Sequence, residues 1–60
     1  MYSEACGRLI RKITGKIPVS EDTAYGMMLM TAALMDLQPD DEEVAQMILE
    51  DCGVVDLRES

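Results

Sequence analysis

SEDTAYGMMLMTAALMDL, residues 20–37, is the stretch that decides the fold of this 60-residue chain. It begins with a serine followed by two acids, which is typical of a helix N-cap and of a first turn in which the helix dipole favours negative charge. Residues 23–35 carry no charge and consist mainly of Met, Leu and Ala, which are strong helix formers. We therefore predict a helix over residues 20–37 with an uncharged body.

The residues before this stretch predict a second helix, over residues 3–14. Apolar side chains recur in steps of four, three and four at Tyr2, Cys6, Leu9 and Ile13, which is the spacing of one helix face. Gly15 ends this helix. Most of the cations of the chain lie on the opposite face of this helix or just beyond its end. They form a basic face: Arg8, Arg11, Lys12 and Lys16.

A third helix is predicted over residues 39–52. It begins after Pro39 with four consecutive acids, which suit the first turn of a helix. Its inward face comprises Val44, Ala45, Ile48, Leu49 and Cys52. Gly53 is in the position of a left-handed C-cap residue, and residues 54–60 form a short tail. The fold class is therefore all-α, a single domain of three short helices spanning residues 1–60.

The uncharged helix is apolar on both sides. Plotted at about 100° per residue, one side carries bulky residues and the other mostly small ones. The bulky side comprises Ala24, Met27, Met28, Met30, Thr31, Leu34 and Met35. The opposite side comprises Tyr25, Gly26, Leu29, Ala32 and Ala33. We expect the bulky side to pack on the other two helices and to form the core.

Two interpretations of the opposite side remain open. Its small residues could accommodate neighbouring helices of the same chain, or they could form a seam at which a second copy approaches closely. A 60-residue domain without Phe or Trp has a marginal core, and oligomerisation is one way to complete it. We favour a homodimer whose self-association seam is Tyr25, Gly26, Leu29, Ala32 and Ala33.

The composition argues against catalysis and against a bound metal or cofactor. The chain has no His, and its two Cys lie on predicted apolar faces. The acidic residues 36–43 lack the Gly and the Glu that a calcium-binding EF-hand loop requires at its sixth and twelfth positions. We expect neither an enzyme, nor a cofactor, nor a metal site. No signal peptide or membrane-spanning stretch is evident, so we expect a cytoplasmic protein with free thiols.

Charge is distributed unevenly. Residues 1–17 hold four cations and one acid, whereas residues 18–60 hold eleven acids and one cation, for a net charge of −7. The acids define a candidate partner surface: Asp36, Asp40, Asp41, Glu42, Glu43, Glu50 and Asp51. Such a surface repels nucleic acid and anionic membranes. The simplest alternative is that these acids are merely solvated.

These features favour a non-enzymatic protein–protein interaction module, such as a regulator, adaptor or inhibitor, that forms a homodimer. One alternative is an acidic nucleic-acid mimic that blocks a basic DNA-binding protein. A second alternative is a weak contact of the basic first helix with nucleic acid or a membrane, although that helix lacks the Trp or Phe anchors of interfacial helices. Otherwise, no direct nucleic-acid or membrane partner is expected.

Overall fold

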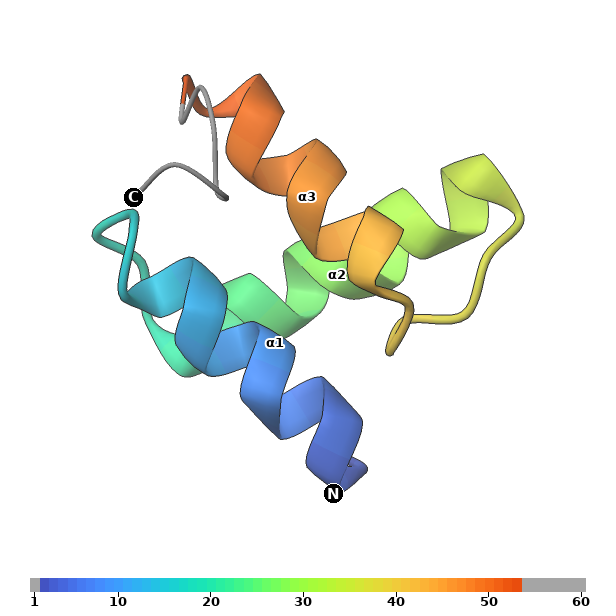
Figure 1. Cartoon of the computed structure of the whole chain (residues 1–60), viewed down its shortest axis with the longest axis horizontal. Helices are drawn as coiled ribbons and strands as arrows, with labels where there is room; N and C mark the ends of the chain where they lie inside the picture. Colours follow the sequence, from blue (N-terminus) through green and yellow to red (C-terminus); the bar gives the residue numbers. More distant parts are fainter. Residues whose placement is uncertain (1, 54–60) are drawn as a thin grey trace.

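Three α-helices make up the part of the chain that the computed structural model describes, residues 2–53 (Figure 1). They are α1 (Glu4–Thr14), α2 (Glu21–Met35) and α3 (Glu42–Asp51). Each helix packs on the other two. In Figure 1, α1 and α3 both lie on the near side of α2. The prediction of an all-α fold of three short helices is confirmed; the predicted tail, residues 54–60, lies outside the described residues.

Side-chain caps set the start of every helix. The Oγ atom of Ser3 accepts a hydrogen bond from the backbone N–H of Cys6 (3.1 Å), and that of Ser20 accepts one from Thr23 (3.2 Å). Asp41 does the same for α3, accepting from the N–H of Glu43 (2.9 Å). Because Asp41 is the cap, α3 begins at Glu42, three residues later than predicted.

The ends of the helices follow from local backbone conformation. α2 ends at Met35 because Asp36 adopts the left-handed conformation (φ 59°, ψ 41°), which short polar side chains tolerate. The predicted end at residue 37 was therefore two residues too late. The predicted glycine cap after α3 is present, since Gly53 has a φ of 91°.

The core lies where the three helices meet, and all of its buried side chains are apolar. The helices contribute Cys6, Leu9, Ile10 and Ile13 from α1, Ala24, Met28 and Ala32 from α2, and Val44, Ala45, Ile48 and Leu49 from α3. Three residues of the connecting loops, Ile17, Val19 and Leu37, pack against this core. The predicted apolar faces of α1 and α3 thus enclose the core, except that Tyr2 and Cys52 are exposed.

The predicted inward side of α2 is confirmed only in part: Ala24 and Met28 are buried and Met27 packs against the core, but the helix is rotated relative to the prediction. Its buried residues are Ala24, Met28 and Ala32, which lie four residues apart along one line. Met30 and Leu34, which we expected in the core, are 70% and 86% exposed. The small alanine side chains on either side of Met28 let neighbouring helices approach the α2 backbone, so the inward side is not the bulkiest one.

Candidate protein-binding surface

Apolar residues also cover the side of α2 that faces away from the core. We call this surface the α2 outer face and define it as Gly26, Leu29, Met30, Ala33 and Leu34. These residues follow the i, i+3, i+4, i+7, i+8 pattern of a single helix stripe. Leu29 is 41% exposed, and Met30 and Leu34 are the most exposed of the large hydrophobic residues of the described chain. The helix thus buries one apolar stripe and presents a second one to solvent.

Gly26 does not serve packing within the chain. A Cβ atom added there would meet no atom of residues 2–53 within 4 Å. A glycine inside a helix destabilises it by about 1 kcal/mol relative to alanine. The packing of the described residues therefore gives no structural reason for this glycine.

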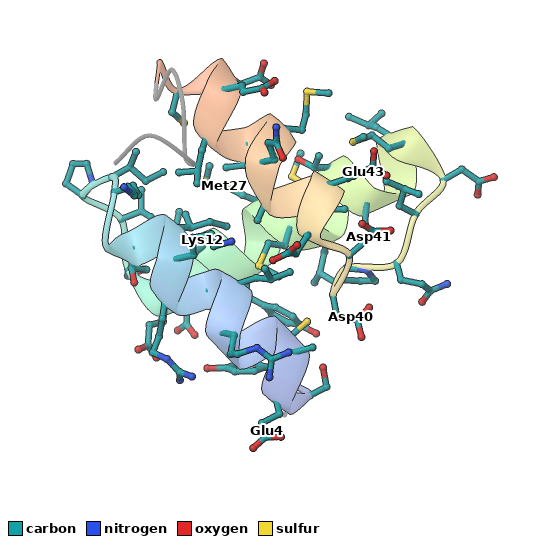
Figure 2. All side chains as sticks on the ribbon, in the orientation of Figure 1. Glu4, Lys12, Met27, Asp40, Asp41 and Glu43 are labelled. Atoms are coloured by element: carbon teal, nitrogen blue, oxygen red, sulfur yellow. The ribbon has the colours of Figure 1, made fainter. Side chains whose placement is uncertain are left out.

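A groove between α2 and α3 continues the α2 outer face. It has a volume of about 170 Å³ and is lined by Met27, Met30, Thr31, Leu34, Ile48, Asp51 and Cys52. Met27, labelled in Figure 2, lies on its α2 side. Two outer-face residues, Met30 and Leu34, form part of the wall of the groove, so the face and the groove are one continuous apolar surface.

Methionines and acids also meet nearer the other end of α3. A hollow of about 170 Å³ there is lined by Met35, Glu43, Gln46, Met47 and Glu50. Met47 is 38% exposed, and Glu50 accepts a hydrogen bond from the side-chain amide of Gln46 (3.3 Å). The apolar surface of α2 and α3 is therefore bordered by carboxylates.

Five of the seven residues of the predicted acidic surface line three different hollows. Asp40 and Glu42 line a polar cleft of about 490 Å³ beside α1, whereas Glu43, Glu50 and Asp51 line the hollows between α2 and α3. The two capping acids serve local structure: Asp36 caps the end of α2 and Asp41 the start of α3. The seven acids therefore differ in their surroundings.

The basic face predicted on α1 lies in that polar cleft. Arg8, Arg11 and Lys12 line it together with Asp40 and Glu42 (Figure 2 labels Lys12 and Asp40). The Nζ atom of Lys12 lies 3.5 Å from Oε2 of Glu42, and this is the one ion pair among residues 2–53. Lys16, exposed just after α1, does not line the cleft. Three of the four predicted cations thus share a cleft with two acids, and one of them, Lys12, forms an ion pair.

The predicted self-association seam is also divided. Ala32 is 2% exposed and belongs to the core, so it is not available to a second copy. Tyr25 packs against the core, and the centroid of its ring lies 5.1 Å from the centroid of the Tyr2 ring. Gly26, Leu29 and Ala33 do lie on the α2 outer face. Sequence reasoning missed Met30 and Leu34, although their spacing from Gly26 places them on the same stripe.

Comparisons with known proteins do not identify a relative. No protein-family model matches the chain, and no curated protein or solved structure matches it at a significant level. Within residues 2–53, no group of three or more His, Cys, Asp or Glu side chains is placed to hold a metal ion. In the same part of the chain, no helix has both the length and the hydropathy needed to cross a bilayer.

Proposed function

We propose that this chain is a non-enzymatic protein–protein interaction module that binds its partner through the α2 outer face. The observation that carries the proposal is the exposure of Met30 and Leu34 on a helix face that bears no charge. Large apolar side chains that adjoin one another at the surface of a small protein mark interaction sites. A partner that covers these residues would remove their apolar surface from water, which would stabilise the complex.

The chemistry of the surface supports a protein as the partner. Anchors spaced i, i+3, i+4 and i+7 on a helix fit against another helix or a groove. Met side chains are flexible and adapt to different partner shapes, which suits a regulator, adaptor or inhibitor. The groove that contains Met27, Met30 and Leu34 extends the contact to α3.

The two alternatives have less support. A nucleic-acid mimic needs a continuous array of carboxylates, and here Asp40 and Glu42 lie beside the cations of α1. A contact of α1 with nucleic acid or a membrane would have to compete with Glu42 for Lys12, and with the charge of Asp40 in the same cleft. The proposal therefore rests on α2 rather than on either charged surface.

Site-specific photo-crosslinking tests the proposal. Benzoylphenylalanine is placed at position 34, on the α2 outer face, and in a control chain at position 16, which is exposed after α1. After irradiation in the cells of origin, we expect an adduct with a defined protein, which is either a partner or a second copy, from position 34 only. The proposal is wrong if position 34 yields no adduct, or only those that position 16 also yields.

A further inference from the structure

We infer that the partner of the α2 outer face is a basic amphipathic helix. Its apolar side would lie on the α2 outer face and in the groove beside α3, and its Lys or Arg residues would meet the acids at the border. This inference rests on the proposed function and names the class of partner. It is carried by the charge around the surface and by the size of the groove.

Among residues 2–53, every charged side chain that borders the surface is negative. Between Ile17 and Gly53 the chain contains nine acids and neither Lys nor Arg. Asp51 lines the groove itself, and Glu43 and Glu50 line the neighbouring hollow beside Met35 and Met47. A partner that brings cations to the edge of an apolar contact is therefore complementary to this surface, and electrostatic attraction would speed its association.

The same charges argue against a second copy as the occupant. A two-fold symmetric contact places the same patch of both chains in opposition. The bordering acids of one chain would then face those of the other, with no cation on α2 or α3 to offset them. Three cations of α1, Arg8, Arg11 and Lys12, already lie in the cleft with Asp40 and Glu42.

The dimensions suit a helix rather than a small molecule. The α2 outer face runs from Gly26 to Leu34, which is about 12 Å at about 1.5 Å per residue. Two turns of a partner helix would span it. Small-molecule sites usually have volumes of about 300–1,000 Å³. The groove, at about 170 Å³, is smaller and fits a protruding apolar side chain of the partner.

A pair of matched peptides tests the inference. One is a helix of about 18 residues, long enough to be stable, with Leu on one face and Lys elsewhere; the other has Glu in place of every Lys. Each is titrated into the isotope-labelled full chain and followed by NMR. We expect the Lys peptide to shift the amide signals of residues 26–34 and 47–52. Its affinity should fall at least about tenfold between about 50 and 500 mM NaCl, and the Glu peptide should not bind.

Variants of the chain separate the designed contact from general attraction to an acidic protein. Leu34→Ser leaves the charge unchanged and should lower the affinity for the Lys peptide at least about tenfold. Asp51→Asn, in the groove, should lower it about threefold. Asp40→Asn removes the same charge from the cleft beside α1 and should leave the affinity unchanged. The inference is overturned if Asp40→Asn has the effect of Asp51→Asn, or if Leu34→Ser has none.

The remaining outcomes distinguish this inference from the proposed function. If both peptides bind equally, or neither binds, the basic helix is wrong, while crosslinking at position 34 still decides the proposed function. If the free chain sediments as a dimer and dilution shifts the signals of residues 26–34, the occupant is a second copy. If the free chain shows nuclear Overhauser contacts between residues 54–57 and Leu34, its own C-terminal segment covers the face and both proposals fail.

Discussion

Helices α1 and α2 bury similar stripes but differ on their other sides. α1 buries Cys6, Leu9, Ile10 and Ile13 and carries Arg and Lys on the side exposed to solvent. α2 buries Ala24, Met28 and Ala32 and exposes Leu29, Met30 and Leu34 instead. Folding therefore buries the apolar face of α1, whereas it buries only one of the two apolar faces of α2. The difference separates residues that stabilise the fold from residues that are free to serve a contact.

Introducing a charge on each helix should give the largest contrast. Leu9 of α1 is 4% exposed, and Leu9→Glu would bury an unpaired carboxylate in a core with no polar partner. A penalty above about 4 kcal/mol exceeds what a 60-residue core can lose, so this variant should be unfolded by circular dichroism.

Leu34→Glu is the matched change on α2. Because Leu34 is 86% exposed, we expect the free energy of unfolding of this variant to stay within about 0.5 kcal/mol of that of the parent chain. If the two substitutions destabilised the chain equally, the contrast between a buried Leu9 on α1 and an exposed Leu34 on α2 would be contradicted.

Two methionines two positions apart on α2 sharpen the same comparison within one helix. Met28 is 0% exposed and Met30 is 70% exposed. Met28→Ala should lower the free energy of unfolding by about 2–5 kcal/mol, because it leaves a cavity in the core. Met30→Ala should change it by less than about 0.5 kcal/mol. Urea denaturation of both variants at low protein concentration measures the difference, and similar midpoints would mean that α2 is rotated differently.

Adjacent alanines should show a smaller contrast. Ala32 lies in the core and Ala33 on the exposed side. Ala32→Leu should destabilise the chain by about 1–3 kcal/mol, since a larger side chain forces its neighbours out of their packing. Ala33→Leu adds the same atoms where they meet solvent and should be close to neutral. Thermal melts of the pair check this, and a stable Ala32→Leu variant would argue that the helices do not pack closely there.

Substitution of Gly26 should have a small effect on stability, and one of opposite sign to the core substitutions. Gly26→Ala should stabilise the free chain by about 1 kcal/mol, because the new methyl group meets no neighbour and alanine favours the helix. Gly53→Ala is the control: its φ of 91° disfavours any side chain, so that variant should be less stable than the parent. Destabilisation by Gly26→Ala in the dilute chain would indicate a close neighbour at this position.

The inward faces of α1 and α3 were predictable because each of these helices has one apolar face. In α1 the steps from Cys6 to Leu9 and Ile13 allow a single inward direction, and the same holds for Val44 to Ile48 in α3. α2 offers two apolar directions, so its pattern predicts a helix and leaves its rotation undetermined. We chose the bulkier side, which is right for Ala24 and Met28 and wrong for Met30 and Leu34, because the small Ala32 takes a place in the core instead.

The candidate site was predicted in part for the same reason. Gly26, Leu29 and Ala33 were assigned from sequence to a self-association seam, whereas Met30 and Leu34 were assigned to the core with the other large residues. Side-chain size alone cannot decide which apolar residues are buried when a helix has more apolar surface than two neighbours can cover. The cap at Asp36 was missed because a left-handed aspartate leaves only a weak sequence signal.

The exposure of Cys52 has a practical consequence. One thiol of the chain, Cys6, is buried in the core, and the other, Cys52, is exposed and lines the groove beside Met30 and Leu34. A thiol-reactive fluorophore added to the folded, unmodified protein should therefore attach at Cys52 first. The labelling rate of Cys52 should drop when a partner fills the groove, so the unaltered chain carries its own reporter of groove occupancy. Cys6 should react only when the chain unfolds.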